Sequence, residues 1–480
     1  MEHNASHLHP HLYQQLAAEL SDAIGRGTLL PGARLPSVRQ AALGRRLSLN
    51  TVVAAYRQLE DSGLIEARPQ SGYYVRSRLA TVASRPGHAA QPARDTDGAI
   101  LDLIGAALAA QQTDGAINLG LAYPRGNDFF PGKKLARLMG QVLRKSPELI
   151  NNYALAPGSQ RLRTQIARRG LALWMSLRPE NIILSHGCTE ALQLAPRAVT
   201  RSGDTVGVES PTFFNLLPMF ASLGLKAVEI PTDPQHGLAL DALESLLAEG
   251  RLNAIVAMPN VQNPLGCIMP LQNKKRLAAL VNRYRIPLIE DALYAELQFS
   301  DALQPAVKAF DRDGWIIFCA SYSKTLAPDF RIGWLEAGRF AADIRKLKNG
   351  NSAAVPMLLG ETLGLFLESG GYDHHLRTLK RRYATHIEKI RTLIAAHFPA
   401  GTRATQPAGG FLIWVELPEG YDSVALFDRA AAERICITPG PLYSPGGDFR
   451  NALRLSCCYP FDERTIAALA RLGELAKSVG

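Results

Sequence analysis

A lysine set between small hydroxyl residues is the feature that most constrains this chain. Lys324 follows Ser321 and Ser323, directly after an apolar run (residues 315–320) that predicts a β-strand, and Arg331 lies seven residues further on. A lysine amine can form a Schiff base with an aldehyde cofactor, and the serines and the arginine are spaced to hold a phosphate beside it. Pyridoxal phosphate (PLP) is the cofactor that needs both. Taken alone, the string is weak support, because a surface lysine after a strand is the simpler alternative.

Upstream segments supply the other groups that a PLP site needs. The apolar residues 286–289 predict a short strand that delivers Asp291 at its C-terminal end, where a carboxylate can keep a pyridine nitrogen protonated. Asn263, in a turn-rich segment, and Tyr294 can contact the phenolic oxygen of the ring. Residues 182–190 predict a strand, a glycine turn and a helix start, where backbone N–H groups and the helix dipole favour an anion.

This order and spacing resemble the fold-type I aminotransferases, over roughly residue 115 to the C-terminus. The resemblance implies the α/β fold of PLP-dependent transferases, with a large and a small subdomain. It implies three catalytic residues: Lys324 as the internal-aldimine lysine, Asp291 as the partner of the pyridine nitrogen, and Tyr294 at the phenolic oxygen. The further cofactor-binding residues that it implies are Asn263 at that oxygen, Phe213 on the ring face, and Cys188, Thr189, Ser321, Ser323 and Arg331 at the phosphate.

Two more residues match this family. Tyr153 looks like the tyrosine that reaches the cofactor phosphate of a neighbouring subunit, so the resemblance implies a homodimer. Arg454 matches the arginine that grips the α-carboxylate of a substrate, a task that suits a planar two-pronged donor. We expect no metal site.

The first eighty residues predict a different kind of domain. Apolar residues at helical spacing predict a helix over 12–27, Ser37 is a natural N-cap for a short second helix, and residues 48–59 predict a third helix. Residues 63–75 then predict two short strands joined by a basic turn that contains glycine. Three helices and a hairpin make a winged helix-turn-helix, whose third helix enters the major groove of DNA while the wing touches the backbone or minor groove.

This N-terminal part is similar to the GntR family of bacterial regulators, over about residues 8–76. Two positions depart from the family. Leu49 stands where an arginine usually precedes the Asn/Thr pair of the recognition helix, and Arg45 stands where the second helix usually ends in an apolar residue. Loss of that arginine removes a base or phosphate contact, so either the operator differs or affinity depends on Arg39, Asn50, Thr51 and Arg68. The DNA contacts that we expect are Ser37, Arg39, Asn50, Thr51, Tyr56, Arg68 and Gly72.

A winged helix joined to an aminotransferase-like domain is the architecture of the MocR subfamily of GntR regulators. We expect a DNA-binding domain at residues 1–78, a linker at 79–112 and a PLP-binding domain at 113–480. Residues 79–98 are rich in Ala, Pro, Gly and polar residues without periodicity, which is typical of a solvated tether. A reach of roughly some tens of ångströms would let each DNA-binding domain sit on a partner subunit, in a domain-swapped homodimer.

Charge and composition agree with this organisation without deciding it. The chain of 480 residues has a formal net charge of +10, but residues 1–78 hold nine Arg or Lys against six Asp or Glu, so charge is weak support for DNA binding. Six scattered cysteines predict reduced thiols. With no signal peptide and no apolar run of membrane length, we expect a cytoplasmic protein.

Three functional hypotheses follow from the sequence. The first is a transcriptional regulator that senses a small amine or amino acid, or PLP itself, through aldimine chemistry at Lys324. The second is an active PLP-dependent aminotransferase with an accessory DNA-binding domain, and transaminase activity stays open because the residues it needs are present. The third, a DNA-binding protein with an empty enzyme fold, is disfavoured by the same residues.

Overall fold

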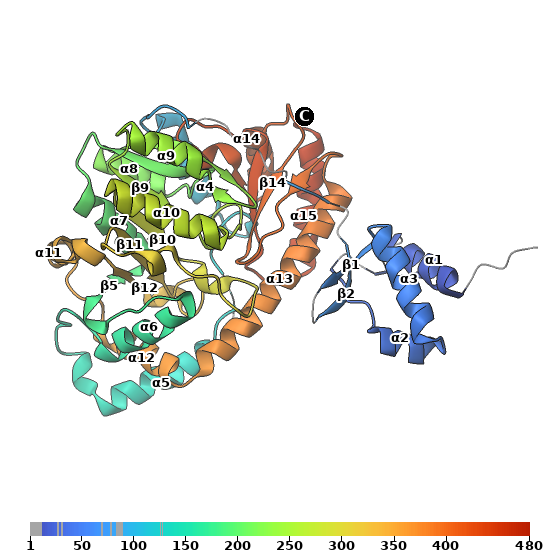
Figure 1. The fold of residues 1–480 in the computed structure, drawn as a ribbon, viewed down its shortest axis with the longest axis horizontal. Coiled ribbons are helices and arrows are strands. Elements are labelled where there is room, and N and C mark those ends of the chain that lie inside the picture. The colour runs from blue at the N-terminus through green and yellow to red at the C-terminus, as the bar shows by residue number, and fades with distance from the viewer. Residues whose placement is uncertain are drawn as a thin grey trace, which may run out of the picture.

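The structure is a computed structural model that describes residues 12–25, 28–29, 32–68, 71–76, 79–82, 90–124, 126 and 128–480. Figure 1 shows a small N-terminal domain in blue, called the head below (residues 12–76), beside a much larger body. Within the described part of the chain, no helix combines the length and the apolar character that crossing a membrane requires.

The head is a winged helix-turn-helix, as expected. Its first helix buries Leu16, Leu20 and Ile24 at helical spacing against the third helix. Ser37 caps the second helix in a capping box, since its hydroxyl accepts from the Gln40 N–H while the Gln40 side chain accepts from the Ser37 N–H. The last two strands pair antiparallel and form the wing. In chain order the elements are α1 (Leu12–Gly25), α2 (Val38–Arg45), α3 (Leu49–Asp61), β1 (Ile65–Arg68) and β2 (Gly72–Val75).

The body contains the large and small subdomains that the resemblance implied. The large subdomain is built on an eight-stranded sheet of order β5-β12-β11-β10-β9-β6-β7-β8, in which β11, β10, β9, β6 and β7 run parallel. Its strands read as nearly continuous apolar runs because both faces of a parallel sheet are covered. They are β5 (Ile182–His186), β6 (Thr205–Ser210), β7 (Lys226–Asp233), β8 (Gly237–Leu238), β9 (Ala254–Ala257), β10 (Leu288–Asp291), β11 (Ile316–Ser321) and β12 (Ile332–Glu336).

Helices cover this sheet and complete the large subdomain. Those between its strands and just after its last strand are α7 (Gly187–Val199), α8 (Leu216–Leu223), α9 (Leu240–Ala248), α10 (Leu271–Tyr284) and α11 (Ala341–Asn351). The remaining helices before and after the sheet are α4 (Gly98–Ala110), α5 (Gly132–Lys145), α6 (Gln160–Gly170) and α12 (Met357–Glu368).

The small subdomain is built on a five-stranded sheet of order β16-β17-β14-β13-β3. Its strands are β3 (Ala80–Thr81), β13 (Arg403–Ala404), β14 (Leu412–Glu416), β16 (Thr438–Pro439) and β17 (Ala452–Ser456), and a separate pair joins β4 (Ile117–Asn118) to β15 (Ile435–Cys436). Its helices are α13 (Gly371–His397), α14 (Ser423–Ala432) and α15 (Glu463–Lys477).

The segment expected to be a linker carries secondary structure at both ends. Ala80 and Thr81 form the edge strand β3, which pairs parallel with β13. The helix α4 begins at Gly98 and buries Ile100 and Ile104 in the core of the body. An extended tether therefore describes at most the middle of the segment, of which residues 83–89 lie outside the described part.

The head lies with its wing toward α13, the long orange helix of Figure 1. The Arg68 guanidinium, at the end of β1, is 3.9 Å from the Glu388 carboxylate of α13. A Cβ placed on Gly32 would lie 2.6 Å from the Cβ of Glu388, so the head backbone touches this helix. On the next turn, Arg391 donates to the carbonyl of Leu79 at 3.2 Å.

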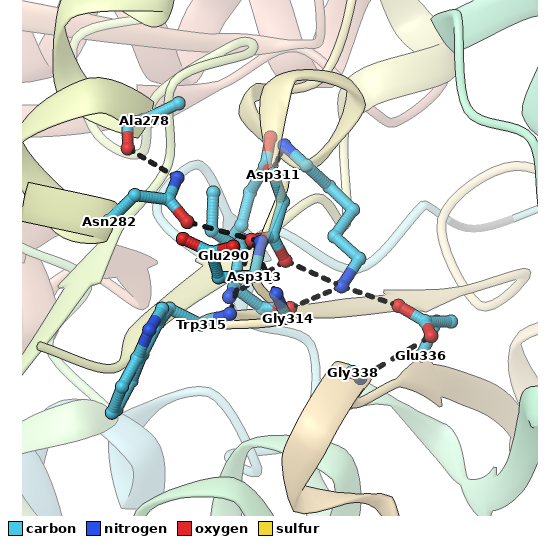
Figure 2. A network of polar contacts seen from close by, with 11 residues as sticks. Ala278, Asn282, Glu290, Asp311, Asp313, Gly314, Trp315, Glu336 and Gly338 are labelled. Carbon is cyan, nitrogen blue, oxygen red and sulfur yellow. Dashed lines mark hydrogen bonds and ion pairs between the residues drawn. The ribbon is translucent and has the colours of Figure 1, made fainter. Parts of the chain in front are cut away.

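A buried polar network joins the neighbouring strands β10, β11 and β12 (Figure 2). The Glu290 carboxylate accepts from the backbone N–H groups of Val307 and Lys308, at 2.9 and 2.8 Å. The Lys308 ammonium pairs with Asp311 at 3.0 Å and with Glu336 of β12 at 2.6 Å, and it donates to the Ile316 carbonyl of β11. Glu290 precedes Asp291 on β10, so this network anchors the ends of three adjacent strands.

Candidate functional site

Lys324 lies just after β11, at the edge of a cavity of about 470 Å³ in the body. Its Nζ donates to the carbonyl of Ala122 at 2.6 Å and stands 4.6 Å from the ring centre of Tyr123. Burial, with smaller contributions from the guanidinium groups of Arg454 and Arg331, lowers the pKa of the Lys324 amine to about 8. A substantial fraction of this amine is therefore neutral near pH 7 to 8, which a nucleophile requires.

Asp291 stands at the C-terminal end of β10 and is almost fully buried. Its Oδ1 accepts from the Leu293 N–H at 3.0 Å and from the Cys188 thiol at 3.7 Å, and both of these residues line the cavity. Its Oδ2 is buried without a hydrogen-bond partner among the described residues. Burial raises the pKa of Asp291 to about 6. A buried carboxylate with one oxygen unsatisfied fits a protonated ring nitrogen, which would pair with that oxygen.

The start of α7 and the turn after β11 form a cradle for an anion. The Ser321 and Ser323 hydroxyls are 2.8 Å apart, and Arg331 donates to the Ser323 hydroxyl at 3.3 Å. Gly187 opens α7 with a φ of +74°, and a Cβ there would lie 2.5 Å from the Arg331 guanidinium. The cradle therefore needs glycine at this position, for its backbone conformation and for space. Cys188 and Thr189 follow in the first turn of α7 and line the same cavity.

Arg454 and Asn263 meet on the side of the small subdomain. Arg454, on β17, is 1% exposed; it donates to the Asn263 side-chain oxygen at 2.9 Å and to the Gly120 carbonyl at 2.6 Å. Its guanidinium lies 5.6 Å from the Phe214 ring centre, and its Nε has no partner in the described part of the chain. A buried guanidinium in contact with the cavity is suited to a carboxylate ligand.

Two aromatic residues complete the cavity. Tyr294 is 2% exposed, and burial raises the pKa of its hydroxyl, so the hydroxyl stays protonated and can donate. Phe213 lines the cavity beside Phe214, with the two ring centres 5.8 Å apart. The structure thus gathers around one cavity, or in direct contact with its lining, the residues of this chain that were expected to bind a cofactor, except Tyr153.

Comparisons with known proteins match this division of the chain. Residues 12–75 match the family of bacterial regulatory proteins, gntR family, and residues 124–472 match aminotransferase class I and II. The uncharacterized HTH-type transcriptional regulator YdcR of Escherichia coli strain K12 is 36% identical over 465 residues, which cover 96% of this chain and 98% of YdcR. The probable rhizopine catabolism regulatory protein MocR of Rhizobium meliloti is 28% identical over 444 residues, which cover 90% of this chain and 86% of MocR.

The chain belongs to the MocR-type regulators of the GntR family. It is an HTH-type transcriptional regulator with an aminotransferase-like domain. Among solved structures, the body of this regulator is similar to LysN, the alpha-aminoadipate aminotransferase of Thermus thermophilus, complexed with N-(5'-phosphopyridoxyl)-L-leucine. The two share 28% identity and a TM-score of 0.71 over 79% of this chain and 98% of LysN.

Tyr153 is the expected cofactor residue that the regulator does not bring to its own site. Its side chain is 97% exposed, and the nearby Ile150 and Leu155 are 67% and 74% exposed. Large apolar side chains rarely gather on a free surface without a partner. Tyr153 lies at the surface and not among the residues that line the cavity.

A segment that the sequence did not single out closes one side of the cavity. The carbonyls of Gly120 and Ala122 accept from Arg454 and Lys324 respectively, and the Leu121 carbonyl accepts from the Cys458 thiol at 3.7 Å. A Cβ on Gly120 would lie 2.6 Å from the carbonyl carbon of Ile437, so the segment passes close to the small subdomain. The contacts of this segment are made by its backbone, so no side-chain pattern announces them. The glycine was the available sign in the sequence of a close backbone approach.

In the head of the regulator, the expected DNA contacts divide into exposed and buried residues. Arg39 and Asn50 are exposed on α2 and α3, and Gly72, with a φ of +107°, opens the second strand of the wing. Thr51 is half-buried, and its hydroxyl lies 2.7 Å from that of Ser48, the N-cap of α3. Tyr56 differs: it is 1% exposed and donates to the Pro36 carbonyl at 2.8 Å. This position favours a packing role over a direct DNA contact.

The remaining head residues carry polar contacts of their own. Ser37 serves as the cap of α2. Arg45, which replaces an apolar residue of the family, pairs with Glu19 of α1, and Leu49 is 51% exposed at the start of α3. Arg68 pairs with Glu66 at 2.8 Å and stacks on the Tyr74 ring at 4.5 Å.

Proposed function

We propose that this MocR-type regulator binds PLP at Lys324 and changes its DNA affinity when a small amine or amino acid occupies the same site. The unpartnered buried oxygen of Asp291 carries the proposal, because leaving it unsatisfied costs free energy that a protonated pyridine nitrogen would recover. The residues around it fit the other parts of the cofactor: the cradle at Gly187, Ser323 and Arg331 suits its phosphate. The cytoplasm is where we expect the regulator to act.

When bound, PLP would supply an aldehyde carbon to which Lys324 is joined, and an incoming amine can replace the lysine at that carbon. Lys324 would be released toward the Ala122 carbonyl, with which it already forms a hydrogen bond. If the ligand has a carboxylate, Arg454 would hold it in place of its present contact with the Gly120 carbonyl. Both changes act on the segment 120–123, so ligand binding would reposition the side of the cavity that touches the small subdomain.

A ligand shifts DNA affinity by its differential affinity for the two states of the protein, and by no more than that. PLP itself is an alternative signal, if the cofactor-free and cofactor-loaded forms bind DNA differently. The rival function is transamination, which the complete set of residues around the cavity favours. Operator binding should be measured with a panel of primary amines and amino acids, beside steady turnover with an amino donor and a keto acid. Turnover without any effect on operator binding would overturn the proposal in favour of the enzyme.

The pKa of Lys324 gives a first prediction, on the pH dependence of cofactor capture. Only the neutral amine attacks the PLP aldehyde, and burial lowers the pKa of Lys324 to about 8. We expect the rate of covalent capture by cofactor-free protein to rise about tenfold per pH unit below pH 8 and to level off above it. Stopped-flow absorbance with free PLP measures this rate. A rate that keeps rising to about pH 10, as for an ordinary lysine, would contradict the assignment.

A second prediction concerns assembly. We propose a homodimer in which Tyr153 of each subunit reaches the cofactor phosphate of the other, so the protein should stay dimeric in light scattering at low concentration. Tyr153→Phe should weaken PLP retention by about ten- to hundredfold, the effect of losing one hydrogen bond to a charged group. Tyr284→Phe, on α10, is the matched control. Monomeric protein that binds PLP fully would refute the prediction.

Exchange of heads between subunits remains part of the proposal for the dimer. In the single chain, the wing lies against α13 of the same chain. In an exchanged dimer the same two surfaces would meet across the subunit interface, so the contacts between wing and helix serve in either arrangement.

A further inference from the structure

The helix α13 touches the loop of Lys324 with one end. The Tyr372 hydroxyl lies 2.8 Å from the hydroxyl of Thr325, and His375 Nε2 lies 2.7 Å from the Thr325 carbonyl. Thr325 is the residue directly after Lys324. Tyr372 is almost fully buried, and its ring centre is 5.8 Å from that of Tyr322, on the other side of the same loop. A shift of the lysine loop therefore has to move, or be resisted by, the first turns of α13.

The middle of α13 has a second link to the cavity. The Tyr383 ring centre is 4.9 Å from that of Phe411, which in turn is 5.4 Å from the ring centre of Tyr294. Tyr383 is buried and close-packed at this point. Because packed interiors transmit displacement and have few voids, the position of Tyr294 is also coupled to this helix.

The other end of α13 holds the head. The Glu388 carboxylate is 3.9 Å from the Arg68 guanidinium of the wing, and the Glu388 side chain is 15% exposed. Arg391, one turn on, is 2% exposed and donates to the carbonyls of Leu79, Ala404 and Thr405. The first of these carbonyls belongs to the segment that leads out of the head. From Tyr372 to Glu388 the helix rises about 24 Å, at 1.5 Å per residue.

The contact with α13 affects a residue that we expect to meet DNA. Arg68 lies between the carboxylates of Glu66 and Glu388 and on the face of the Tyr74 ring. Two carboxylates next to a guanidinium reduce its attraction for a phosphate, so Arg68 held beside Glu388 is less available to a DNA backbone. The docked wing is therefore in a state that competes with DNA binding.

We propose that α13 is an autoinhibitory docking surface for the wing, in which Glu388 withholds Arg68 from DNA while Tyr372 and His375 connect the same helix to the loop of Lys324. The inference rests on the proposed function for its link to a ligand. The docking itself depends on the head and on α13 alone, so it can be tested separately.

The test is Glu388→Gln in full-length, PLP-loaded protein, with DNA enriched by the parent protein from a random-sequence pool. In fluorescence anisotropy we expect binding three- to fivefold tighter than that of the parent. Arg68→Ala should remove the gain, so that Glu388→Gln has no effect in the Arg68→Ala background. Glu249→Gln, after α9, deletes the same charge away from the head and should leave affinity unchanged. Unaltered affinity of Glu388→Gln, or a gain that persists without Arg68, would overturn the proposal.

A reversible disulfide between the head and α13 provides an independent measurement. The Cβ position of Gly32 lies 2.6 Å from the Glu388 Cβ, so a cysteine at each position needs a separation of about 1 Å more to form a disulfide. The native cysteines are buried. We expect oxidation of the Gly32→Cys/Glu388→Cys protein to weaken DNA binding at least tenfold and reduction to restore it. Oxidised, cross-linked protein that binds DNA as tightly as the reduced form would overturn autoinhibition. Failure of the proposed function would appear elsewhere, as absent PLP absorbance or absent response to amines.

Discussion

Replacement of Lys324 with alanine should give a protein that holds no covalent PLP and no longer responds to amino effectors. Lys324 is the lysine that lines the cavity, and its lowered pKa leaves a nucleophilic fraction at neutral pH. Borohydride reduction followed by mass spectrometry of the peptides measures attachment, and anisotropy with operator DNA measures the response. Basal operator affinity should stay within about twofold of the parent value, because the head supplies the contact free energy.

Two control variants separate chemistry from charge and folding. Lys324→Arg keeps a cation at the end of β11 but cannot form the covalent bond, so it should behave as Lys324→Ala does. Lys346→Ala removes a lysine that is 79% exposed on α11 and should retain both cofactor and response. Covalent PLP on another lysine would show that the assignment is wrong. If Lys324→Ala responded like the parent, occupancy of the pocket or PLP itself would carry the signal.

The residues of the site that could be predicted from the sequence are those whose side chains carry the chemistry. Asp291 ends a short buried strand, and strands of a parallel sheet bring such residues to one edge, so its position followed from the apolar run before it. Ser321 ends β11, and Ser323, Lys324 and Arg331 lie in the loop between β11 and β12, which confines them to one place. The cap expected at Ser37 likewise marks the start of α2.

Backbone contacts left no comparable pattern. The carbonyls of Gly120 and Ala122 accept from Arg454 and Lys324, but a carbonyl belongs to every residue type, so no spacing of side chains indicates it. The two-residue strand β3 is too short for an alternating pattern to reveal it. α4 is different, because its buried Ile100, Ile104 and Ala107 have helical spacing that was available in the sequence. The linker expected at 79–112 extended the composition of residues 79–98 too far along the chain, into this helix.

The head shows how one pattern can support two roles. Tyr56 lies on the recognition helix α3, which made a DNA contact a reasonable expectation. An aromatic ring on a three-turn helix also serves as core, and here its hydroxyl reaches the Pro36 carbonyl while its ring lies 5.0 Å from that of Tyr73. Burial decides between the roles, and burial depends on how the wing packs on α3.

Replacement of Arg39 with alanine should weaken operator binding about ten- to hundredfold in a dimer, since both heads lose a charge-assisted contact. Arg39 is the second residue of α2 and is exposed, near the N-terminus of a helix whose dipole also favours a phosphate. We expect Arg39 to contribute a larger share of the DNA affinity because Leu49 stands where the family usually has an arginine. The PLP absorption spectrum should not change, because no contact joins Arg39 to the cavity in the described structure.

Salt dependence distinguishes a phosphate contact from a base contact at Arg39. Each neutralised phosphate contributes about 0.9 to the slope of log K against log salt, so Arg39→Ala should lower the slope of a dimer by about two. Arg251→Ala, which removes an exposed arginine paired with Glu249 after α9, should leave both affinity and slope unchanged. A weakened variant with the parent slope would place Arg39 on a base edge, since base contacts release no counterion. An Arg39→Ala protein with parent affinity and slope would remove Arg39 from the DNA interface and leave operator binding to the start of α3 and to the wing.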